Sequence, residues 1–318
     1  MAKKESKTHV IKKELKSNLE SVQHNLTRKQ YTRDGNRFIR YCREKHNVIS
    51  LSECSQYIQE YCDDLVEKGY SASTVHTYVA AACKACEVSM KTIQKPIRHS
   101  SEFKRGRAVT QNCKYQSCMD LDDEKWKRLV HFQKAAGLRR AEIAKLRGKD
   151  LVYDESGYLC IQVASGKGGK YHLQMIHPKH YEFIKSLFQG KRADELIFTE
   201  EEMTNKLNLH SLRAQRAREA YSDYLYAINN KPGYREYLEM QILARWNKYN
   251  VHKSSGLPKA FNFKELEGEY HLRGKNREFA KERGLPLHYN KLAVMATSIF
   301  YLSHWRNNVT ITSYLLAI

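Results

Sequence analysis

Apolar side chains recur at helical spacing through the first third of the chain, and this periodicity predicts short amphipathic helices. One runs over about 27–45 and opens on a capping box, a second runs from about 50 to Gly69, and a third begins after Ser71 or Ser73. The predicted inward positions are apolar, aromatic or cysteine: Tyr31, Phe38, Cys42, Tyr57, Ile58, Tyr61, Leu65, Val75, Tyr78, Val79, Ala82 and Cys86. Because the outward faces are rich in arginine and lysine, this module is predicted to be a basic, compact helical domain.

The two segments that flank the helical module lack such a pattern. Residues 1–24 are rich in lysine and show no sustained apolar face, which predicts a mobile basic arm. Residues 91–119 mix lysine and arginine with serine, glutamine and proline, without periodicity. This composition predicts a basic linker between the helical domain at 25–90 and a second domain at 120–318.

The second domain combines helical periodicity with one β-hairpin. Apolar and polar residues alternate over 159–163 and again over 171–175, on either side of the turn Ser165-Gly166-Lys167-Gly168-Gly169-Lys170. Helical patterns occur near 126–130, 180–188, 221–228 and 237–246. The predicted fold class is therefore mainly α (α+β), in which a mostly helical second domain carries a small antiparallel β-sheet.

Composition narrows the class of partner. The chain has Lys+Arg 55 against Asp+Glu 35, a formal net charge of +20, which favours a polyanion such as nucleic acid. No apolar run is long enough to span a membrane, and the first residues lack the apolar core of a signal peptide. We therefore expect a cytoplasmic, nucleoid-associated protein with no membrane partner.

The eight cysteines indicate thiols more strongly than a metal site. Cys83 and Cys86, together with Cys113 and Cys118, would supply four ligands to zinc. However, the first two fall inside an alanine-rich helical pattern, and the spacing of the other two is unusual for a zinc knuckle. Buried free thiols are expected instead, with no metal and no cofactor.

Five short motifs of the second domain stand in an order typical of one enzyme family. They are Gly137-Leu138-Arg139 with Glu142, the glycine-rich turn that carries Lys167, His210-Ser211-Leu212-Arg213, Leu302-Ser303-His304, and finally Tyr314. On these residues the chain resembles the tyrosine recombinase (phage integrase) family of site-specific DNA recombinases. The resemblance covers about 120–318, and the helical module is similar to the core-binding (SAM-like) domain of that family.

The resemblance implies that DNA strands are cut and rejoined by transesterification, without metal or cofactor. Tyr314 is the expected nucleophile, which attacks the scissile phosphate and leaves a 3′-phosphotyrosyl link and a free 5′-hydroxyl. Arg139 and Arg213 are expected to bind the phosphoryl oxygens through paired hydrogen bonds, and Lys167 to protonate the leaving 5′ oxygen. The two motif histidines are expected to hydrogen-bond the phosphoryl group or to assist proton transfer from the tyrosine.

The same resemblance sets the expected partners. Double-stranded DNA is the substrate, bound by a homo-tetramer on paired recombination sites, with an accessory DNA-bending or directionality protein as a further partner. The expected role is that of an integrase or transposase of a mobile element. Two alternatives stay open: a non-catalytic, sequence-specific DNA-binding protein on the same scaffold, and a Xer-like recombinase that resolves chromosome dimers.

One departure from the family pattern leaves the second arginine open. Arg213 and His304 are separated by 90 residues, far more than the family usually has. Either about 218–287 is an insertion, or the second arginine lies later, in Tyr270-His271-Leu272-Arg273. We favour Arg213, because the full His-x-x-Arg-x-x-x-Ala pattern occurs there.

Overall fold

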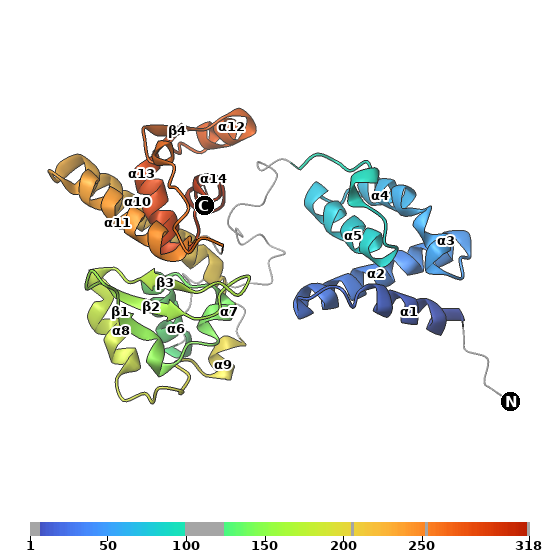
Figure 1. The fold of residues 1–318 in the computed structure, drawn as a ribbon, viewed down its shortest axis with the longest axis horizontal. Helices are drawn as coiled ribbons and strands as arrows, with labels where there is room; N and C mark the ends of the chain where they lie inside the picture. The colour runs from blue at the N-terminus through green and yellow to red at the C-terminus, as the bar shows by residue number, and fades with distance from the viewer. Residues whose placement is uncertain (1–6, 99–123, 205–206, 252–253, 317–318) are drawn as a thin grey trace. The chain divides into compact units, whose positions relative to one another are not determined.

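The chain divides into two units with separate hydrophobic cores, Met1–Glu102 and Phe103–Ile318. The computed structural model shown in Figure 1 describes four stretches, residues 7–98, 124–204, 207–251 and 254–316. Most of the predicted linker, including Cys113 and Cys118, lies outside the described residues.

The regular elements of the first unit are all helices in its described residues. Its elements are α1 (Lys7–Asn18), α2 (Asn25–His46), α3 (Leu51–Ser55), α4 (Ile58–Glu67), α5 (Ala72–Ala85) and the 3₁₀ turn η1 (Met90–Thr92). Ser71 rather than Ser73 caps α5, since its side chain accepts a hydrogen bond from the Thr74 amide at 3.3 Å. The predicted capping box at 27–30 is wrong, because α2 already begins at Asn25.

The core of this unit is built from α2, α4 and α5. Phe38 and Cys42 of α2 pack with Tyr61 of α4 and Val79 of α5, and all four are buried. The rings of Phe38 and Tyr61 lie 5.1 Å apart, in the tilted arrangement that aromatic pairs favour. The described cysteines are free thiols, and all but Cys86 are buried.

The prediction of a mobile basic arm over 1–24 is wrong for Lys7–Asn18, which forms α1. Ile11 and Leu15 of α1 and Leu19 just after it recur every four residues, and each is only 1% exposed. Gly35 of α2 permits the close approach, since a Cβ there would come 3.0 Å from a methyl group of Leu15. A stripe only one residue wide among lysines does not stand out as an apolar face in the sequence.

The first half of the second unit packs helices on a three-stranded sheet. In chain order it has α6 (Glu124–Ala136), α7 (Arg140–Ile143), η3 (Gly148–Asp150), β1 (Leu151–Tyr153), β2 (Leu159–Val163), β3 (His172–Met175), η4 (Pro178–His180), α8 (Tyr181–Phe188) and α9 (Glu200–Met203). The strands are antiparallel in the order β1-β2-β3, with Leu151 opposite Ile161 and Ile161 opposite Gln174. The predicted hairpin is therefore confirmed as β2 and β3, and β1 was not predicted.

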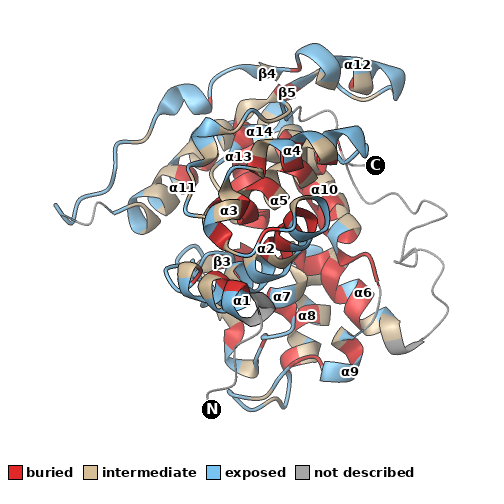
Figure 2. Cartoon of the chain, turned by 90° about the vertical axis from the view of Figure 1, so that its right-hand side faces the viewer, coloured by how far each residue is buried: buried red, intermediate tan, exposed pale blue. Residues whose placement is uncertain are grey.

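The second half is built around one long helix. Its elements are α10 (Leu209–Asn230), α11 (Tyr234–Tyr249), η5 (Phe263–Glu265), β4 (Glu269–His271), α12 (Gly274–Glu282), β5 (His288–Asn290), α13 (Lys291–Ala296), the π-helical turn η6 (Thr297–Tyr301), α14 (Asn307–Thr310) and a second π-helical turn, η7 (Ile311–Leu315). Figure 2 shows buried residues along α6 and α10, which pack together. The fold class is mainly α with small antiparallel sheets, as predicted.

The region at about 218–287 is partly integral to this unit. Residues 218–230 are the continuation of α10, and Tyr224 shares a core with Leu238 and Ile242 of α11. The part of this region that lies mostly outside the core, as far as its residues are described, follows α11 and includes β4 and α12. None of the helices in the described part of the chain has the length and apolarity needed to cross a bilayer.

Candidate active site

Arg139 is held at the start of α7 by the turn that follows α6. Gly137 adopts φ +63°, a left-handed conformation that glycine tolerates, and a Cβ there would lie 3.4 Å from Cγ of Arg216. The amide and the guanidinium of Arg139 both donate to the Glu142 carboxylate, at 2.9 and 2.6 Å. Burial opposes ionisation of Glu142, but the charge and hydrogen bonds of Arg139 outweigh it and lower the pKa of this carboxyl.

Arg213 lies in the second turn of α10 and is almost fully buried, with 1% of its surface exposed. Its guanidinium donates to the Gly137 carbonyl and, at 2.9 Å, to the Leu302 carbonyl. Arg139 donates to the same Leu302 carbonyl at 3.4 Å, so one backbone oxygen accepts hydrogen bonds from both arginines. Burial lowers the pKa of Arg213, yet a guanidinium stays protonated in proteins, and two positive charges therefore meet here.

The turn that carries His304 is held in place by hydrogen bonds to the sheet. Ser303 adopts φ +56°, a left-handed conformation that favours glycine. Its hydroxyl donates to the side chain of Gln174 at 2.9 Å. Gln174, on β3, is fully buried and also donates to the carbonyls of Ala136 and Tyr301. The sheet therefore anchors the turn that carries His304.

Tyr314 lies at the centre of the predicted site residues. Its ring centroid is 5.4 Å from that of His210 and 6.2 Å from that of His304, and Cζ of Arg213 lies 5.7 Å from it. Tyr314 belongs to η7 and is buried, with 7% of its surface exposed. Side chains from α10, the turn after η6 and η7 thus surround one phenol, and Arg139 joins them through the shared Leu302 carbonyl.

His304 is a neutral imidazole in this environment. Burial, followed by the charges of Arg213, Arg306 and Arg139, lowers its pKa to about 3. Both ring nitrogens are buried, and neither has a hydrogen-bond partner among the described residues. Nε of Arg213 is likewise buried without a hydrogen-bond partner among the described residues. Buried polar atoms of this kind are costly, and their concentration around Tyr314 indicates a site that receives a polar ligand.

Lys167 is the predicted site residue that the structure leaves apart from the others. It is exposed on the turn between β2 and β3. The base of that turn packs on His172, since a Cβ on Gly166 would come 2.9 Å from Cε1 of the His172 ring. This imidazole lies near enough to Arg139 and Arg213 for their charges to lower its pKa.

His172 is a site residue that the sequence analysis missed. Burial is the main cause that lowers its pKa to about 4; the charges of Arg139 and Arg213 add to it, and Glu142 acts in the opposite direction. Nε2 of His172 is buried without a partner among the described residues. The sequence analysis used only the apolar positions of this hairpin, whereas His172 and Gln174 share one side of β3, and Gln174 bonds the turn that carries His304. The sequence offered one signal for His172: it and Gln174 are polar and two residues apart, on the predicted hairpin that carries Lys167.

Arg273, the alternative candidate for the second arginine, does not lie beside Tyr314. Arg273 is exposed at the start of α12, and no contact between it and Tyr314, His304 or Arg139 occurs within the described residues. The structure thus places Arg213, and not Arg273, beside the other predicted site residues.

Comparison with known proteins adds little to this geometry. No family model matches the sequence, and no curated protein matches it either. Among solved structures, the chain is similar to the crystal structure of XerA recombinase, at 16% identity over 67% of this chain and 84% of that one, with a TM-score of 0.22. A TM-score of this size is too low to establish a shared fold, so the site residues themselves must support any function.

Proposed function

We propose that the Phe103–Ile318 unit cuts and rejoins DNA strands by transesterification, with Tyr314 as the nucleophile. One observation carries the proposal: side chains from residue 139 to residue 314 converge on a single phenol, and the arginines among them share one carbonyl acceptor. This combination of a phenol, two guanidinium groups and two imidazoles suits attack on a phosphodiester.

A phosphodiester in the site would supply hydrogen-bond partners for the buried polar atoms around Tyr314. Its non-bridging oxygens accept hydrogen bonds from Arg139 and Arg213, whose charges offset the charge that develops on phosphorus-bound oxygen. His304 carries ring nitrogens without partners in the described structure, and His210 lies against the nucleophile. Either imidazole accepts the phenolic proton as the bond from Tyr314 to phosphorus forms.

Departure of the 5′ oxygen requires a proton, and Lys167 is the proposed donor. The turn that carries it includes Gly168 and Gly169, both with positive φ, near +77° and +72°. Such a turn changes conformation at low cost, and DNA in the site would draw the ammonium group toward the phosphate. Reversal of the step by another strand's 5′-hydroxyl rejoins the DNA without an energy source.

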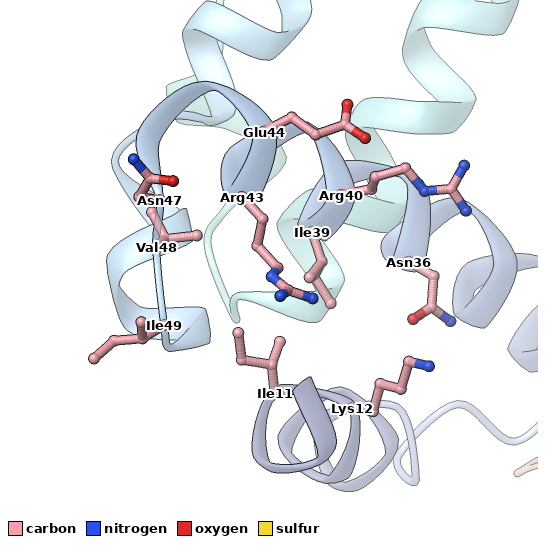
Figure 3. A pocket seen from close by; sticks show the side chains of 10 residues that line it. All are labelled: Ile11, Lys12, Asn36, Ile39, Arg40, Arg43, Glu44, Asn47, Val48 and Ile49. Atoms are coloured by element: carbon pink, nitrogen blue, oxygen red, sulfur yellow. The ribbon is translucent and has the colours of Figure 1, made fainter. Parts of the chain in front are cut away.

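The first unit supplies a basic groove for the DNA backbone. Between α1 and α2, three cations line this groove together with two amides and one carboxylate, as Figure 3 shows: Lys12, Arg40, Arg43, Asn36, Asn47 and Glu44. Cations and amides of this kind bind phosphates without reading the base sequence. The expected assembly is a tetramer on paired sites, with integration or transposition of a mobile element as its role.

The test is a covalent adduct. A nicked duplex that contains DNA from the borders of the gene is incubated with the full chain in EDTA, and the products are separated under denaturing conditions. We expect a protein–DNA adduct from the wild type and from Tyr226→Phe, an exposed control, and none from Tyr314→Phe. Specific binding without an adduct would favour a non-catalytic DNA-binding protein and overturn the proposal.

A further inference from the structure

The small sheet of β4 and β5 presents two different faces. The strands are antiparallel, with Glu269 opposite Asn290, Tyr270 opposite Tyr289 and His271 opposite His288. Because side chains alternate along a strand, Tyr270 and Tyr289 share one face, and the other paired positions share the opposite face. Tyr289 is buried in a cluster with Ile311 and Leu315, so the tyrosine face is the inner one.

The outer face gathers three groups that bind metals. Glu269, His271 and His288 are exposed, and one ligand atom from each lies within 4.8 Å of the other two. The two imidazole rings are 4.4 Å apart, and Nδ1 of His288 lies 3.6 Å from the Glu269 carboxylate. Ligands of a tetrahedral zinc ion are about 3.4 Å apart, given bonds of about 2.1 Å. Rotation of exposed side chains closes that difference.

We propose that Glu269, His271 and His288 form a binding site for a divalent transition metal of the zinc type. Two imidazoles and one carboxylate suit zinc and its first-row neighbours, whereas magnesium and calcium favour sites made of oxygen ligands. Asn290, the fourth residue of this face, accepts a hydrogen bond from the Ala293 amide at 3.0 Å as the cap of α13. The remaining coordination position therefore belongs to solvent.

The site joins two strands that the chain connects only through α12. Each strand has three residues, and a two-stranded sheet of that size is marginal by itself. A metal on the outer face would tie β4 to β5 and stabilise the inner face, where Tyr289 packs against Ile311 and Leu315 of η7. The metal thus acts on the support of the segment that contains Tyr314, and it takes no part in the proposed strand cleavage.

The experiment measures zinc stoichiometry in the full, reduced chain without a histidine tag. Zn²⁺ is titrated against a chromophoric chelator of known affinity. We expect the wild type to bind one more Zn²⁺ per chain than Glu269→Gln, His271→Gln and His288→Gln, because the cysteines contribute equally to all. Glu267→Gln, an exposed carboxylate just before the strand, is the matched control and should retain the ion. Equal stoichiometry in the wild type and the three ligand variants overturns the site.

Limited proteolysis tests the tie between the strands. Arg273 and Arg277 are exposed between β4 and β5, where trypsin can cut. Zn²⁺ should slow cleavage there several-fold in the wild type and not in His271→Gln, while Mg²⁺ should have no effect. Cleavage that Zn²⁺ leaves unchanged in the wild type would show that no metal links the two strands.

Discussion

The core of the first unit and the surroundings of Tyr314 differ in how many buried polar atoms lack a hydrogen-bond partner. Around Phe38 the buried side chains are mostly apolar, aromatic or thiol, and the buried carboxylate of Asp34 is paired with Arg33 at 2.9 Å. The hydroxyl of Tyr61 is the exception there, since it is buried without a partner among the described residues. Around Tyr314, Nε of Arg213 and both ring nitrogens of His304 are buried without partners among the described residues. The first region is arranged for stability, and the second leaves hydrogen-bonding capacity for a ligand at a cost in stability.

The largest expected effect is on the first region. Phe38→Ala removes a fully buried ring and should lower the free energy of unfolding of that unit by about 3–5 kcal/mol. The measurement separates the units, because all three tryptophans, Trp126, Trp246 and Trp305, lie in the second one. Circular dichroism should show an earlier transition, whereas tryptophan fluorescence should keep its midpoint. A matching shift in both signals would mean that the two cores do not unfold separately.

The next effect is on activity rather than stability. Arg213→Met should reduce adduct formation by about 10²–10³-fold, because it removes a donor from the charge that develops on the phosphate. Its unfolding free energy should fall by about 1–3 kcal/mol, since the carbonyls of Gly137 and Leu302 lose a donor. Arg273→Met is the control and should retain activity. Loss of activity in the control alone would place the second arginine at 273.

The smallest effect depends on pH. Burial and nearby arginines lower the pKa of His172 to about 4 in the folded chain, so the unfolded chain binds more protons below about pH 6.5. Stability contributed by the neutral imidazole is therefore present at pH 7 and is lost as the pH falls. From pH 7 to pH 5, His172 should account for about 1–2 kcal/mol of the loss, so the loss should be smaller by that amount in His172→Gln. Urea unfolding followed by tryptophan fluorescence measures both. An equal pH dependence in the two proteins would contradict the buried, neutral His172.

Much of the fold was predictable because its signals are local. The helices around Phe38 and Tyr61 follow from periodicity, and the β2–β3 hairpin from alternation on both sides of a glycine-rich turn. The helix α1 was not predicted, because Ile11, Leu15 and Leu19 form a narrow apolar stripe among charged residues. Its packing against α2 is what shows that this stripe is buried. The strands β4 and β5 have three residues each, too few to show alternation.

The site was predictable as far as its residues fall into motifs. Arg139, His210 and Tyr314 stand in recognisable sequence contexts, and the structure places them together. His172 has no motif, and its position depends on which face of β3 meets the arginines. The exposed place of Lys167 could not be derived either, because a glycine-rich turn takes its conformation from what it contacts.

The most direct test of the convergence on Tyr314 is to identify the residue that becomes linked to DNA. Trypsin and nuclease digestion of the covalent adduct, followed by mass spectrometry, should give a nucleotide-modified peptide of residues 307–318, whose single tyrosine is Tyr314. We predict the modification on that peptide and on no other. A nucleotide on any of the other tyrosines would contradict the account.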